Sequence, residues 1–148
     1  MKNKKKLETV LPHKESMLLI DDIVDYSLDE NWLKSKVTIK ESNLFYDKDL
    51  KGIDTAVGIE YMAQTIGCYA FYKGKQKEPK IGFLLGTRLY NNATPVFELG
   101  KTYYILVKEY FSAEIFSFEC FIYNENDDEI ASATINVIQD NLEGIINE

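Results

Sequence analysis

One apolar stretch of the sequence holds the side chains best suited to chemistry. The segment from Thr55 to Tyr72, TAVGIEYMAQTIGCYAFY, is almost wholly apolar or small, yet it includes Glu60 and Gln64. A carboxylate that is taken out of water must pair, change its protonation or take part in a reaction. Glu60 is therefore our first candidate for a functional acid or base. A structural acid that its neighbours satisfy is the alternative.

The residues around Glu60 predict a helix over residues 55–73. Asp54 or Thr55 is a suitable N-cap, no proline interrupts the segment, and Gly74 among lysines is a suitable end. The segment is hydrophobic nearly all round, so we expect other structure to enclose the helix and bury Glu60.

The first turns of this helix offer further groups for a reaction. The N–H groups near Val57 and Gly58 are expected to lack helical partners, so they can form an oxyanion site that Gly58 allows a ligand to approach closely. Gln64 lies one turn beyond Glu60 and can orient it, although a structural role is the alternative.

The remaining chain has the pattern of strands. Residues 17–28 and 32–40 are predicted to form a hairpin, and residues 41–53 to be irregular. Four more strands are predicted over residues 80–90, 101–112, 114–123 and 128–140. Two strands, one long helix and four strands indicate an α+β protein, in which one antiparallel sheet packs on one helix. We expect a single domain over residues 1–148, with residues 1–6 as a disordered tail.

The composition excludes several classes of function. The formal net charge of −7 argues against a nucleic acid or an anionic membrane as partner. No apolar run approaches the roughly 20 residues of a membrane span, and no signal peptide is evident, so we expect a cytoplasmic protein. Cys68 and Cys120 have no ligand spacing and are expected to be buried thiols. With a single histidine, we expect neither a metal site nor a cofactor.

Three motifs resemble those of a known family. LPHKESMLLIDDIVDY (residues 11–26), GIEYMAQTIGCYAFY (58–72) and IGFLLGTRLYNNATPVFELGKTYYI (81–105) are similar in order and interval to motifs of FabZ-type (3R)-hydroxyacyl-acyl carrier protein dehydratases. They are closer still to the ApeP-like branch, which is associated with aryl polyene and related fatty-acid-like pathways. The resemblance covers roughly residues 8–140. It implies the hotdog fold, in which a curved antiparallel sheet wraps around a central helix.

The resemblance fails at one important residue. The family's catalytic histidine, in GHFP, stands about fourteen residues before the helix glutamate, and this chain has Tyr46 there. His13, in LPH, is the only histidine, and a phenol is a poorer base than imidazole at neutral pH. We therefore predict His13 as the base and Glu60 as the acid, with a structural His13 as the alternative. Tyr46 and Gly86 are expected at most to line the pocket.

The resemblance implies a dehydratase that removes water from a 3-hydroxyacyl thioester to give a trans-2-enoyl thioester. The substrate would be carried on acyl carrier protein or coenzyme A. A homodimer or higher homo-oligomer is expected, or a hetero-oligomer with another hotdog subunit. Two alternatives stay open: a non-catalytic or partner-dependent subunit that binds acyl chains, and an acyl thioesterase, since the fold does not choose among these functions.

Overall fold

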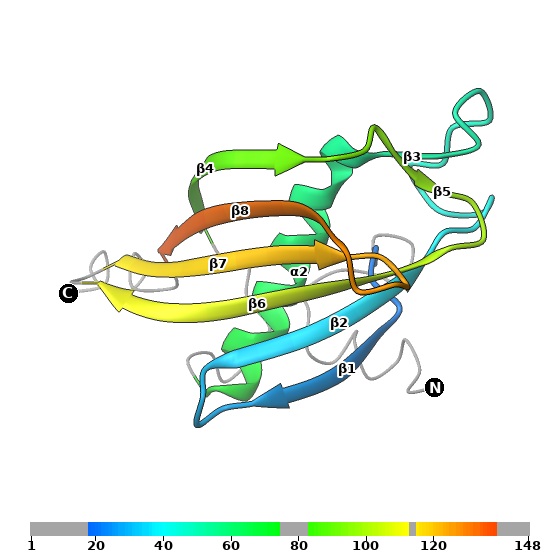
Figure 1. Ribbon diagram of the computed structural model, residues 1–148. Helices are drawn as coiled ribbons and strands as arrows, with labels where there is room; N and C mark the ends of the chain where they lie inside the picture. Colours follow the sequence, from blue (N-terminus) through cyan, green and yellow to red (C-terminus); the bar gives the residue numbers. More distant parts are fainter. Residues whose placement is uncertain (1–17, 75–82, 113–114, 139–148) are drawn as a thin grey trace.

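Six antiparallel strands form the main sheet in the part of the chain that the structure describes. The computed structural model describes residues 18–74, 83–112 and 115–138, and Figure 1 shows their arrangement. The strands run in the order β1-β2-β6-β7-β8-β4 across the sheet. Their bounds are β1 Asp22–Ser27, β2 Trp32–Thr38, β4 Phe83–Asn92, β6 Thr102–Ser112, β7 Ile115–Tyr123 and β8 Glu129–Ile138. The predicted strands are confirmed, with ends that shift by a few residues.

Among the described residues, one long helix packs against this sheet. A short 3₁₀ helix, η2 (Thr55–Val57), leads directly into α2 (Gly58–Tyr72), so the helix predicted over residues 55–73 is confirmed. Helix α2 contacts β2, β6 and β7 and crosses behind these strands in Figure 1. The α+β arrangement expected from the order of elements is therefore present.

Alternation of side chains decides which face of the sheet meets α2. In β2, Leu33, Ser35 and Val37 are buried, whereas the lysines between them are half-buried. The same alternation recurs in β6 and β8, as a half-buried sheet requires. The buried Ser35 hydroxyl lies 2.8 Å from the Thr65 hydroxyl of α2, which satisfies both polar groups inside the core.

Two short strands lie in segments for which the sequence did not predict strands. β3 (Gly52–Asp54) pairs with β5 (Val96–Glu98) as a separate two-stranded sheet. Residues 41–51, just before β3, are irregular as predicted. Because β3 ends where η2 begins, this small sheet fixes the start of the helix that carries Glu60.

Three further observations describe the protein more broadly. Cys68 and Cys120 are buried free thiols, as expected, and burial raises the pKa of Cys68 to about 12. Among the described residues, no helix has the length and apolar character needed to cross a bilayer. Within the same ranges, no three histidine, cysteine, aspartate or glutamate side chains gather as a metal site would require.

Candidate active site

Three hydrogen bonds hold the start of the central helix in place. Asp54 caps it, because its Oδ1 accepts from the Ala56 N–H at 2.8 Å. Thr55 donates its N–H to the Pro95 carbonyl at 3.1 Å, which ties the helix start to the segment before β5. The Tyr90 hydroxyl, at the end of β4, donates to the Thr55 carbonyl. These hydrogen bonds fix the position of the first turn of α2, which we call the platform.

Glu60 lies on the exposed side of this platform. It is the acidic residue of the first turn of α2, and it is exposed in the single chain. The expectation that Glu60 is buried is therefore wrong for the single chain. The reason is the size of its neighbours, because Ala56 is exposed and Ala63 and Gly67 are half-buried on the same side of the helix. These small residues cannot shield a glutamate side chain.

Gly58 is needed for packing inside the same turn. A Cβ at this position would collide with the Tyr90 hydroxyl, and it would lie 3.0 Å from Ile122 Cδ1 and 3.3 Å from Phe97 Cζ. The Gly58 N–H donates to the Thr55 carbonyl and closes the 3₁₀ turn. The expectation of a free N–H at Gly58 is therefore wrong, because the 3₁₀ turn supplies a partner. Val57 is half-buried at the junction of η2 and α2.

Gln64 fastens an earlier part of the chain to the helix. Its side chain is 6% exposed, and its Oε1 accepts from the Leu19 N–H at 2.9 Å. Leu19 lies six residues after His13, and His13 itself lies outside the described residues. Gln64 is thus buried although Glu60, one turn earlier, is exposed. The amide of Gln64 connects α2 to the segment that follows His13.

The other two predicted pocket residues lie in different elements. Tyr46 is half-buried and packs against the hydrophobic core from the loop before β3. Gly86 lies in β4 opposite Asn136 of β8, next to a shift in the register of the two strands. Such irregularities bend a strand and change the direction of its side chains. Of the predicted site residues that the structure describes, Gly58, Glu60 and Gln64 lie in α2, and Val57 directly precedes them as the last residue of η2.

An aromatic cluster packs against the first turns of α2. No pattern in the sequence predicted this cluster. Tyr61 packs on Phe97 with ring centroids 5.4 Å apart, and Phe97 packs edge-on against Tyr103 at 4.9 Å. Burial raises the pKa of Tyr61, and the nearby Asp21 carboxylate adds to this effect. Burial likewise raises the pKa of Tyr90 to about 12. Both tyrosines therefore keep their protons at neutral pH.

The whole chain matches a family of dehydratases. The sequence profile of the ApeP-like family, described as ApeP dehydratase, matches residues 5–147. The chain belongs to the ApeP-like family. This ApeP-like chain has the hotdog fold and a dehydratase-like function, as its motifs led us to expect. The comparison with curated proteins gave no match.

Solved structures agree with this membership. The dehydratase heterocomplex ApeI:P from Xenorhabdus doucetiae matches with 25% identity and a TM-score of 0.78, over 96% of this ApeP-like chain and 97% of that one. The PaaI protein of the E. coli phenylacetic acid degradation operon has 10% identity and a TM-score of 0.63, over 80% and 82% of the two chains. The smu.793 protein of Streptococcus mutans UA159, bound to acetyl CoA, has 13% identity and a TM-score of 0.63, over 86% and 95%. The last two share the fold alone.

Proposed function

We propose that this ApeP-like chain removes water from a 3-hydroxyacyl thioester in an active site that a second hotdog subunit completes. The observation that carries the proposal is the exposure of Glu60 in the first turn of α2 of a dehydratase-family protein. The substrate would be carried on acyl carrier protein or coenzyme A, and the product is a trans-2-enoyl thioester and water.

The reaction requires two proton transfers. A base takes a proton from C2, beside the thioester carbonyl, and the electrons of that C–H bond form the C2–C3 double bond. The C3–O bond breaks, and an acid gives its proton to the departing hydroxyl, which leaves as water. Negative charge that develops on the thioester oxygen is stabilised by hydrogen-bond donors.

Glu60 fits the role of the acid. It lies at the N-terminal end of α2, where the helix dipole stabilises the carboxylate that remains after the proton has been given. The capped helix start and the Tyr90–Thr55 bond keep this turn in place. A fixed carboxyl needs little rearrangement during the reaction.

His13 is our proposed base. Its imidazole is suited to proton abstraction at neutral pH. The Leu19–Gln64 bond supports this role, because it fastens the chain that follows His13 to α2 one turn beyond Glu60. Six residues span at most about 20 Å, a length that would allow His13 to reach the first turn of α2.

A second subunit would turn an exposed carboxyl into an active-site acid. In the single chain, water surrounds Glu60, whereas a covered site excludes water and strengthens electrostatic contacts. Ala63 has a small side chain and Gly67 has none, so another protein surface can approach α2 closely at these positions. A solved relative is a dehydratase heterocomplex, which favours a different hotdog subunit as partner; a second copy of this chain is the other candidate.

The test is the Glu60→Gln substitution, since glutamine keeps the shape but cannot transfer a proton. We expect dehydration of a 3-hydroxyacyl-pantetheine thioester to fall by about 10²-fold or more, followed as formation of the enoyl thioester. The assay is run with the chain alone and with a candidate hotdog partner. Glu119→Gln, at an exposed position of β7, is the matched control and should keep its activity.

Two results would contradict the proposal. Near-normal turnover of Glu60→Gln would remove Glu60 from the reaction. Turnover by the chain alone as a proven monomer, at the rate of the assembled protein, would remove the need for a second subunit.

His13→Ala should also abolish turnover with little change in the melting temperature. A lower melting temperature, with activity that returns on cooling, would mean that His13 is structural.

A further inference from the structure

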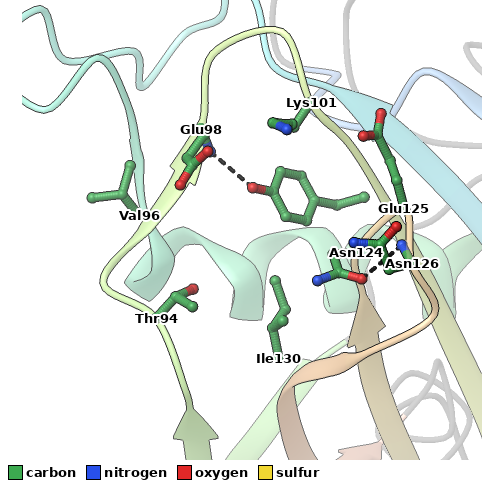
Figure 2. Close-up of a pocket in the computed structure, with 9 residues that line it drawn as sticks. Thr94, Val96, Glu98, Lys101, Asn124, Glu125, Asn126 and Ile130 are labelled. Atoms are coloured by element: carbon green, nitrogen blue, oxygen red, sulfur yellow. Dashed lines mark hydrogen bonds between the residues drawn. The ribbon is translucent and has the colours of Figure 1, made fainter.

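A cavity of about 150 Å³ lies at the end of the sheet, and none of the predicted site residues lines it. Figure 2 shows its walls, which come from the segment before β5, from β5 itself, from the start of β6 with the turn that precedes it, and from the β7–β8 turn with the start of β8. A cavity of this size is large enough for a ligand of about the size of benzene.

Two hydroxyl groups belong to the inner wall of this cavity. Thr94 Oγ1 is buried and has no hydrogen-bond partner, and Figure 2 shows it turned toward the interior of the cavity. Tyr103 is 5% exposed, and its hydroxyl oxygen accepts from the Glu98 N–H at 2.9 Å. Burial raises the pKa of Tyr103, so this hydroxyl keeps its proton at neutral pH and can donate it. A buried hydroxyl without a partner costs free energy, so such a wall favours a ligand with a hydrogen-bond acceptor.

The remaining walls restrict the ligand further. Val96 and Ile130 provide apolar surface, which disfavours an ion at the inner end. The exposed rim carries the carboxylates of Glu98 and Glu125 and the ammonium of Lys101, a net negative charge that disfavours an anion. The rim carboxylates can accept from an N–H group.

We propose that this cavity binds a small neutral molecule that contains a secondary amide. The amide carbonyl accepts from Thr94 and Tyr103, the amide N–H faces the rim carboxylates, and the alkyl groups lie against Val96 and Ile130. This site is separate from the proposed chemistry at Glu60 and does not depend on it.

The cavity wall is directly connected to the start of α2. Thr94 and Val96 flank Pro95, whose carbonyl accepts from the N–H of Thr55 at 3.1 Å. On the other side, Tyr103 packs on Phe97, which packs on Tyr61 of α2. An amide in the cavity therefore contacts the same segment that holds the first turn of the helix.

The experiment is a titration of the full chain with N-methylpropionamide, followed by saturation-transfer NMR. Methyl propionate is the matched probe, because it keeps the carbonyl and the shape but lacks the N–H. We expect saturable, millimolar binding of the amide and several-fold weaker binding of the ester. No saturable binding of the amide, or equal binding of the two probes, would overturn the proposal.

The Thr94→Val substitution separates binding from stability. Valine has the shape of threonine without the hydroxyl, so we expect about two- to tenfold weaker amide binding. Because Thr94 Oγ1 has no partner in the empty cavity, the melting temperature should stay the same or rise. Thr134→Val, on the opposite face of β8 from the core, is the control and should leave binding unchanged. Unchanged binding in Thr94→Val, or a lower melting temperature, would overturn the assignment.

Discussion

Two tyrosines on α2 are equally buried, but their hydroxyls have different surroundings. Tyr61 is 1% exposed, and its hydroxyl has no hydrogen-bond partner. Tyr69 is fully buried, and its hydroxyl donates to Glu109 Oε1 at 2.7 Å. The same substitution to phenylalanine should therefore have different effects at the two positions.

We expect Tyr69→Phe to lower the free energy of unfolding by about 1–3 kcal/mol, because it leaves a buried carboxyl with one bond fewer. Tyr61→Phe should leave the free energy of unfolding unchanged or raise it by up to about 1 kcal/mol, since it removes an unsatisfied group. Urea unfolding of both variants measures the difference. A large loss in Tyr61→Phe would mean that its hydroxyl has a partner, such as a bound water.

At the residue scale, the sequence predicted Glu60 as the acid, a role that stays a prediction, and it did not predict the surroundings of this side chain. Glu60 was recognised because it interrupts an apolar segment. Its exposure was missed because alanine and glycine count as apolar in a sequence pattern, although Ala63 and Gly67 cover very little surface. The bond from Leu19 to Gln64 spans 45 residues, and local patterns do not report such contacts.

At the scale of elements, β4 and α2 are joined by the contact between Tyr90 and the first helical turn. We expect Gly58→Ala to lower the free energy of unfolding by about 1–3 kcal/mol, because the new methyl group collides with the Tyr90 hydroxyl and approaches Ile122. The double variant with Tyr90→Phe should lose less than the sum of the two single variants, because the collision is then relieved. Additive losses in urea unfolding would show that the two positions do not interact.

Long elements were predictable from the sequence, and short ones were not. The helix and the alternation of residues 32–39 follow from hydrophobic periodicity, which many residues report together. β3 and β5 have three residues each, too few for a periodic signal, and they exist because they pair with each other. Residues 1–17, which include His13, lie outside the described residues, so the predicted base was not tested.

At the scale of the whole molecule, the proposed partner surface is the side of α2 that includes Glu60. We expect Ala63→Lys to prevent assembly, because a lysine there blocks close approach. Ala93→Lys, at an exposed loop position, is the control and should assemble normally. Light scattering at micromolar concentration measures the mass, and thermal unfolding checks that the fold is intact. Normal assembly of a folded Ala63→Lys protein would exclude this surface.

Several buried groups together predict weaker folding at alkaline pH. Burial raises the pKa of Cys68 and of Tyr90 to about 12 each, from ordinary values of 9.0 and 10.0. The folded state thus holds protons that the unfolded state releases, so the free energy of unfolding falls as the pH rises above about 9. Melting temperatures measured from about pH 7 to about pH 11 test this. A constant melting temperature across that range would contradict it.

The position of β4 in the sheet has a consequence for the synthesis of the protein. Among the described strands, β4 lies at an edge and pairs with β8, which ends at Ile138. While the ribosome extends the chain, β4 has already emerged, but its hydrogen-bonding neighbour has not yet been made. The backbone of β4 therefore lacks its partner strand until β8 has been made. We expect nascent chains that stop before Glu129 to be captured by chaperones, and the addition of β8 to release them.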